Sequence, residues 1–129
     1  MASRINITSG APWEDIVGYC RAVRVGNVIE VAGTTAVDDD GNVVGPDDPY
    51  TQTRFILSKI ERALKACGAT LQDVVRTRLF VTDISRWVEY GQAHGEVFRD
   101  VKPAASMIEV KGLIQPGLMI EVEVTAIVT

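Results

Sequence analysis

Residues 48–84, DPYTQTRFILSKIERALKACGATLQDVVRTRLFVTDI, place a long amphipathic helix directly before a strand. Asp48 can accept hydrogen bonds from the first free N–H groups of a helix, and Pro49 suits the first helical position because its nitrogen carries no hydrogen. Apolar side chains then recur at helical spacing, at Ile56, Ile60, Leu64 and Cys67. Gly68 is a typical end for such a helix. The β-branched run over 73–82 predicts the strand.

The segments on both sides of this unit also alternate between strand and helix. Residues 19–25 and 27–35 are rich in β-branched side chains and predict an antiparallel hairpin with its turn at Gly26-Asn27. After the central strand, a second helix is expected to begin at a cap on Ser85. Its apolar stripe consists of Trp87, Tyr90, Gly91, His94, Phe98 and Val101.

The end of the chain predicts two more strands, over 104–111 and 118–128. The expected order is therefore ββαβαββ, which is an α+β fold. Two helices can cover only one face of such a sheet, so we expect both of them on the same face. A chain of 129 residues holds one hydrophobic core, and residues 1–129 are expected to form a single domain.

The sheet face away from the helices carries an unusual mixture of side chains. Alternation along the strands assigns the following residues to it: Val74, Arg76, Arg78, Phe80, Ala105, Met107, Glu109, Met119, Glu121 and Glu123. A face exposed to solvent would hold fewer large apolar side chains. A face buried in the hydrophobic core of a single chain would hold fewer charges. The mixture favours a homo-oligomer assembled on this face. The alternative is a monomer with surface ion pairs on a partly exposed sheet.

Composition excludes several classes of protein. The net charge is −4, which does not favour a partner with a phosphate backbone, so no nucleic-acid binding is expected. No apolar run reaches the roughly 18 residues that cross a bilayer, and the N-terminus has no apolar signal region, so we expect a cytoplasmic protein without a membrane partner. The cysteines Cys20 and Cys67 are expected to be free thiols. One histidine and two distant cysteines give no zinc-type ligand spacing, so no metal site is expected.

Four segments together resemble the YjgF/RidA (reactive intermediate deaminase) family over residues 15–128. They are VGYCRAVRVGNVIEVAGTT at 17–35, QTRFILSKIERALKACGATLQDVVRTRLFVTDI at 52–84, KPAASMIEV at 102–110 and MIEVEVTAIV at 119–128. The resemblance implies a chorismate-mutase-like fold with one mixed sheet, a homotrimer and ligand clefts between subunits. The implied activity is hydrolysis of reactive enamines or imines to 2-keto acids and ammonia, without metal or cofactor.

Single positions of this chain match the family pattern to different degrees. Glu121 matches the glutamate that holds a water molecule, which makes it the candidate catalytic residue. The candidate substrate-binding positions are Tyr19, Arg21, Ala32, Gly33, His94, Ala105 and Met107. Deaminating members have Pro-Ala-Arg-Ser where this chain has Pro-Ala-Ala-Ser, so Ala105 replaces the arginine that clamps the substrate carboxylate. Met107 replaces a cysteine.

Loss of the arginine predicts an altered substrate. An arginine clamps a carboxylate with two parallel charge-assisted hydrogen bonds, and alanine offers neither charge nor donors. Losing such a contact costs on the order of 2–5 kcal/mol, which is roughly 30- to 5,000-fold in rate. Another cation could replace it, and Arg21 is the candidate because it falls beside Tyr19. The alternative for Arg21 is a surface or interface ion pair.

Two further residues and the function itself leave alternatives open. Glu121 either holds water or forms an ion pair with Arg76 or Arg78 at the interface between subunits. His94 is either a hydrogen-bonded core residue or a proton shuttle beside the cleft. The expected function is hydrolysis of a small ligand, with a carboxylate as one candidate. The alternatives are a ligand-binding or scaffold trimer without chemistry and, less favoured, an endoribonuclease or translation inhibitor.

Overall fold

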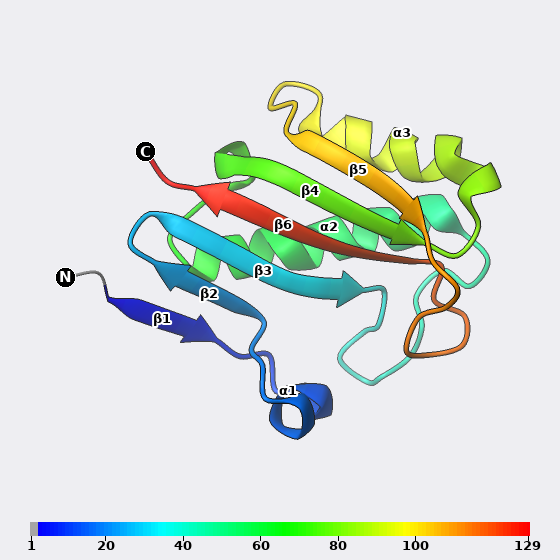
Figure 1. Cartoon of the computed structure of the whole chain (residues 1–129). Coiled ribbons are helices and arrows are strands. Elements are labelled where there is room, and N and C mark those ends of the chain that lie inside the picture. The colour runs from blue at the N-terminus through cyan, green and yellow to red at the C-terminus, as the bar shows by residue number, and fades with distance from the viewer. Residues whose placement is uncertain (1–2) are drawn as a thin grey trace.

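The computed structural model describes residues 3–129, which form one six-stranded sheet with helices against it (Figure 1). The strands are β1 (Arg4–Ile7), β2 (Ala22–Val25), β3 (Val28–Thr35), β4 (Val74–Val81), β5 (Ala104–Glu109) and β6 (Ile120–Ile127). The helices are α1 (Pro12–Val17), α2 (Pro49–Ala66) and α3 (Trp87–Phe98), with 3₁₀ turns at Leu71–Asp73 and Ile84–Arg86. The α+β class and the ββαβαββ order are confirmed. β1 and α1 precede that order and were not predicted, because they are too short to show a period.

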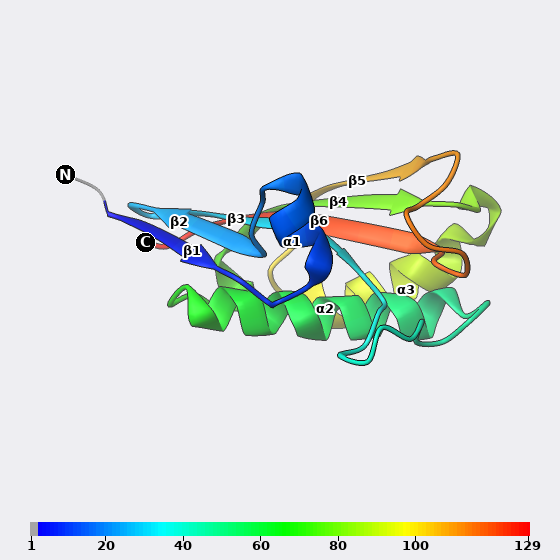
Figure 2. The same cartoon turned by 90° about the horizontal axis from the view of Figure 1, so that it is seen from below.

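The sheet is mixed, with strand order β1-β2-β3-β6-β4-β5. All neighbouring strands are antiparallel except β4 and β5, which are parallel. Both α2 and α3 cover the same face, as expected from the helix count (Figure 2). The core lies between these helices and the sheet. The largest fully buried side chains in it include Tyr90, Phe98, Ile29, Ile56, Leu57, Ile60, Leu64, Ile120 and Val122.

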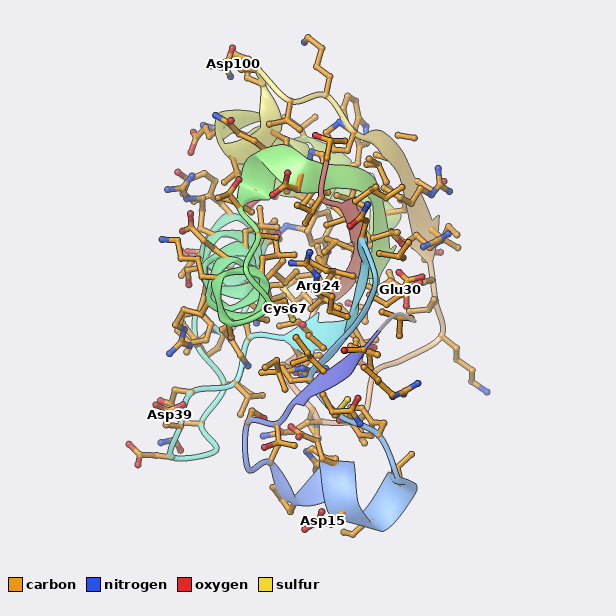
Figure 3. All side chains as sticks on the ribbon, turned by 90° about the vertical axis from the view of Figure 1, so that its left-hand side faces the viewer. Asp15, Arg24, Glu30, Asp39, Cys67 and Asp100 are labelled. Atoms are coloured by element: carbon orange, nitrogen blue, oxygen red, sulfur yellow. The ribbon has the colours of Figure 1, made fainter. Side chains whose placement is uncertain are left out.

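The ends of α2 follow the sequence prediction. The Asp48 carboxylate accepts hydrogen bonds from the Thr51 backbone N–H at 3.0 Å and from the Thr51 hydroxyl at 2.7 Å, and Pro49 is the first helical residue. At the other end, Gly68 adopts a left-handed conformation with φ of 82°. Its N–H and that of Ala69 bond the last free carbonyls of the helix. Arg24 of β2 also donates to the Cys67 carbonyl at 2.7 Å, which ties the hairpin to this end of α2 (Figure 3).

The start of α3 differs from the prediction. Asp83, rather than Ser85, supplies the cap, because its carboxylate accepts the Ser85 N–H and initiates a 3₁₀ turn. The α-helix itself begins only at Trp87. Trp87 is 58% exposed and does not belong to the buried stripe, which is formed by Tyr90, Ala93 and Phe98. Tyr90 and Phe98 belong to the predicted stripe, so the difference is confined to the start of the helix, where a 3₁₀ turn precedes Trp87.

A bulge corrects the expected alternation at the start of β4. The pairing of β4 with β6 shifts register between Val74 and Arg76. Val74 is therefore buried in the core rather than placed on the open face, and Val75 is 43% exposed. A bulge places two residues opposite one, which reverses the faces on one side of it.

The faces of β5 also differ from the prediction. The register of β5 with β4 decides which face each of its side chains occupies. Ala105 stands opposite Thr77 and Met107 opposite Leu79. Thr77 and Leu79 are buried toward the helices, and residues paired across strands point to the same face. Ala105 and Met107 therefore lie on the helix side. The expectation that they share the open face with Glu121 was wrong, because alternation defines two faces but does not say which one is buried.

The open face still mixes apolar and charged side chains. It carries Val25, Val28, Glu30, Arg76, Arg78, Phe80, Ile108, Glu121, Glu123, Thr125 and Ile127. Figure 3 shows Glu30 on this side of the sheet, opposite α2. Several of the apolar residues are 40% exposed or more. None of the helices in residues 3–129 combines the length and the apolar character that a bilayer crossing requires.

Candidate functional site

The main recess lies where β2 stops and β3 continues without a neighbour. β2 pairs with β3 only as far as Val31, so the last residues of β3 have a free edge on that side. The recess measures about 870 Å³ and is bordered by residues 7–13, the loop over 37–41 and one side of α2. Pockets of this size hold small molecules. Its polar lining includes Tyr19, Arg21, Lys59, Arg62 and Glu121.

Gly33 allows the Glu121 carboxylate to approach the backbone of β3. The pairing of β3 with β6 shifts register between Val31 and Thr34, so the backbone bulges at this point. A Cβ atom added to Gly33 would overlap the carboxylate of Glu121. A side chain at this position would therefore displace the Glu121 carboxylate from the backbone of β3.

Glu121 is a shielded carboxylate without a cationic partner. It forms no ion pair among residues 3–129, because Arg78 pairs with Glu123 at 3.6 Å and Arg76 donates to the Ser106 hydroxyl at 2.8 Å. Within one chain, Glu121 therefore pairs with neither Arg76 nor Arg78, and an ion pair across a subunit interface stays a prediction. Burial raises the pKa of Glu121, the charge of Arg21 lowers it, and Glu123 adds to the rise. Such a carboxylate is a stronger base than an exposed one.

Arg21 faces the same recess. Its Nη2 donates to the Gly33 carbonyl at 2.6 Å, and its guanidinium carbon lies 5.8 Å from the centre of the Tyr19 ring. Its Nε is buried and has no hydrogen-bond partner among residues 3–129. A buried charged donor without a partner costs free energy, which an anionic ligand would recover.

Lys59 and Arg62 of α2 complete the lining, although no local sequence pattern indicates a role for them. Lys59 Nζ donates to the Thr35 and Val37 carbonyls, each at 3.0 Å. Burial, then Arg21, then Arg62 lower the pKa of Lys59. Both α2 residues lie outside the apolar stripe of the helix, so they resembled ordinary surface residues. They can be assigned to the recess only because α2 lies beside the free edge of β3 in the folded chain.

The other predicted positions lie elsewhere in the chain. Ala32 lines a second hollow of about 300 Å³, together with Arg78 and Glu123. Ala105 and Met107 are on β5, the edge strand farthest from β2. Of the predicted site residues, the recess of one chain therefore brings together Tyr19, Arg21, Gly33 and Glu121.

His94 is packed between α3 and the sheet. Its Nε2 lies 2.9 Å from the hydroxyl of Thr77, and its ring centre lies 4.8 Å from that of Phe98. Burial lowers its pKa, which favours the neutral ring. His94 lies on the helix face of the sheet while Glu121 lies on the open face, so within one chain the geometry favours the core role.

The recess contains cations and single carboxylates rather than a metal-binding group. Among residues 3–129, no three His, Cys, Asp or Glu side chains lie close enough together to hold a metal ion. The side chains that could hold a ligand are Arg21, Lys59 and Arg62, and their chemistry selects an anion. Glu121 could accept a proton from a water molecule beside that anion.

Comparison with known proteins gives consistent matches along nearly the whole chain. The family described as endoribonuclease L-PSP matches residues 9–128. An uncharacterised protein of Streptomyces coelicolor is 36% identical over 93% of this chain and 89% of its own length. A RutC family protein of Pyrococcus abyssi is 32% identical over 98% of each chain.

Solved structures agree with these matches. A member of the YjgF/YER057c/UK114 family from Mycobacterium tuberculosis is 50% identical, with a TM-score of 0.89, over 98% of this chain and 100% of its own. A protein described as a putative endoribonuclease from Thermotoga maritima is 28% identical, with a TM-score of 0.81, over 96% of this chain and 92% of its own.

Proposed function

Because this chain belongs to the endoribonuclease L-PSP family, which is also called YjgF/RidA, we propose that it hydrolyses a reactive imine or enamine without metal or cofactor. The observation that carries the proposal is the Glu121 carboxylate, which is shielded, free of ion pairs and beside Arg21 in one recess. The protein is proposed to act in the cytoplasm, where such intermediates arise.

The chemistry requires a held water molecule and a polarised C=N bond. Glu121 accepts one proton from the water as the water oxygen bonds to the carbon of the protonated imine, which gives a neutral carbinolamine. Glu121 then passes this proton to the amino group, and the C–N bond breaks as the Glu121 carboxylate takes up the hydroxyl proton. A ketone leaves, and ammonia carries the last proton away as ammonium, which restores the carboxylate. Arg21 would hold an anionic group of the substrate so that the imine carbon lies over the water.

We propose that the site is completed by a neighbouring subunit in a trimer. Ala105 lies on the opposite edge strand from the recess, so the family's clamp position can reach a recess only on another copy. The open face supports this assembly, because its exposed apolar residues need a partner and its charges can be compensated across an interface.

Sedimentation equilibrium at micromolar concentration tests the assembly. The expected mass is about 42 kDa, three times the 14.0 kDa of one chain. Replacing the exposed Ile108 on the open face by Glu is expected to shift the mass toward 14.0 kDa, because a charge would be buried in the interface. A wild-type mass of one chain would refute the trimer.

The substrate is proposed to differ from the usual 2-imino acids because Ala105 replaces the clamp. An amino-acid oxidase can generate a panel of 2-imino acids in the presence of semicarbazide, and loss of semicarbazone formation reports hydrolysis. We expect weak activity with 2-iminobutanoate and higher activity with another imine of the panel. A rate with 2-iminobutanoate equal to that of an arginine-containing relative would contradict the role assigned to Ala105.

The second candidate is a ligand-binding or scaffold trimer without chemistry, and it gains support if no imine of the panel is hydrolysed. An endoribonuclease is less supported, despite the names of some relatives. The chain has a net charge of −4, and the cations of the recess are few and interspersed with acids. A gel shift with RNA at low salt would favour that third function.

A further inference from the structure

We infer that the α2 side of the recess binds a second anionic group, so that the ligands are small dicarboxylates with one carboxylate near Arg21 and the other near Lys59 and Arg62. The inference rests on the proposed function only in taking the natural ligand to be an imine. The selectivity for two anionic groups depends on the charges of the recess alone.

Three cations surround one small recess, and none of them has a carboxylate as an ion-pair partner among residues 3–129. Arg21 and Lys59 instead bond neutral backbone carbonyls, which satisfy donors but do not cancel charge. An ammonium group has three donors, and Lys59 uses two of them. One N–H of Lys59 and the whole exposed guanidinium of Arg62 are therefore free for a ligand.

The acids that line the recess form no ion pair with these cations within residues 3–129, and Asp39 and Asp38 each act on the pKa of Lys59 less strongly than Arg21 and Arg62 do. Asp38 directs one carboxylate oxygen at its own loop, where it accepts the N–H groups of Asp40 at 3.0 Å and Asn42 at 2.9 Å. Asp39 is exposed on the same loop, as Figure 3 shows. Glu121 lies at Gly33, beside Arg21 rather than beside α2.

The cations fall into two groups, and this division defines the ligand. Arg21 is fixed at the Gly33 end, next to Glu121, where the reacting carbon would lie. Lys59 is fixed by Thr35 and Val37, farther along the free edge of β3, and Arg62 lies one turn away on α2. A single carboxylate at Arg21 leaves the second group uncompensated. A second carboxylate, a few bonds from the first, would reduce the repulsion among the three cations.

Calorimetric titration of the full chain tests the inference with stable keto acids, which need no turnover. We expect 2-oxoglutarate to bind about 10- to 100-fold more tightly than 2-oxobutanoate, because a charged hydrogen bond contributes about 1.5–3 kcal/mol. Arg62→Gln and Lys59→Met are each expected to weaken 2-oxoglutarate and to leave 2-oxobutanoate unchanged. Lys65→Met is the control, because Lys65 is on α2 but pairs with Glu61 outside the recess.

Lys59 holds Thr35 and Val37 by hydrogen bonds, so Lys59→Met also tests the stability of this loop. Arg62→Gln does not, because Arg62 is exposed, and it therefore tests the inference by itself. Equal binding of the two keto acids, no binding of either, or the same loss for both ligands in Arg62→Gln would overturn the inference. Selective binding of 2-oxoglutarate together with no imine hydrolysis would support the dicarboxylate site and refute the proposed deamination. The two proposals can therefore fail independently.

Discussion

Glu121→Gln is expected to lower the rate of imine hydrolysis by about 10²- to 10⁴-fold, the usual contribution of a positioned general base. The amide keeps the shape of the side chain but cannot accept the proton of the attacking water. Semicarbazone competition with the best imine of the panel measures the loss. Glu123→Gln is the matched control, because Glu123 lies two residues along β6, faces the same side and pairs with Arg78. It is expected to keep most of the activity.

The pH dependence of wild-type activity follows from the raised pKa of Glu121. Activity of the wild type is expected to fall as the pH drops through that raised pKa, because the base becomes protonated. In the folded protein the charged form is disfavoured by burial. The stabilisation associated with the raised pKa is complete below the unfolded value of about 4.3 and is lost as pH rises through the folded value.

At neutral pH, Glu121→Gln is therefore expected to fold at least as stably as the wild type, and this advantage should vanish in acid. Urea unfolding at both pH values measures it. A variant that is inactive but more stable identifies Glu121 as a functional residue rather than a structural one. Full activity in Glu121→Gln, or equal loss in Glu123→Gln, would show that another group activates the water.

Gln52→Ala is expected to lower the free energy of unfolding by about 3–5 kcal/mol, the largest stability effect that we expect from a polar side chain here. Gln52 is fully buried in α2. Its amide nitrogen donates to the carbonyls of Gly45 at 3.2 Å and Gly117 at 2.9 Å, and its amide oxygen accepts the N–H of Met119 at 2.9 Å. Truncation leaves three backbone groups of two loops without these partners.

Urea unfolding followed by circular dichroism measures this change. Gln92→Ala is the control, because Gln92 lies on exposed α3 surface and only contacts Glu96 at 3.5 Å. Its expected effect is within about 0.5 kcal/mol. Because Gln52 anchors the turn before β6, its loss is also expected to weaken keto-acid binding at the nearby recess. A change in stability similar to that of Gln92→Ala would show that water replaces the lost amide.

Local chemistry explains the parts of the fold that could be predicted. Asp48, Pro49 and Gly68 mark the ends of α2 by hydrogen-bonding and backbone rules that act within a few residues. Strands β2 to β6 were recognised from runs of β-branched and alternating apolar side chains. The candidate site was predicted in part, since Tyr19, Arg21, Gly33 and Glu121 do meet in one recess.

Errors arose where an interaction distant in sequence decided the outcome. Alternation along β5 is the same in either register, and only its parallel pairing with β4 turns Ala105 and Met107 toward the helices. The bulge at Val74 depends on the pairing with β6 in the same way. Lys59 and Arg62 belong to the recess only because β3 extends beyond the end of β2 at the point where α2 lies beside it. No local sequence pattern encodes this feature.

By itself, the sequence determined the α+β class and the order of the main elements, because periodicity and capping act over short distances. The choice of Glu121 came from the resemblance to the YjgF/RidA family. Tertiary structure alone decided which face each edge strand presents, that Glu121 has no ion pair within residues 3–129, and that Arg21, Lys59 and Arg62 line its recess. These depend on strand register and on contacts between segments tens of residues apart, whose free energies are realised only when the sheet and α2 pack together.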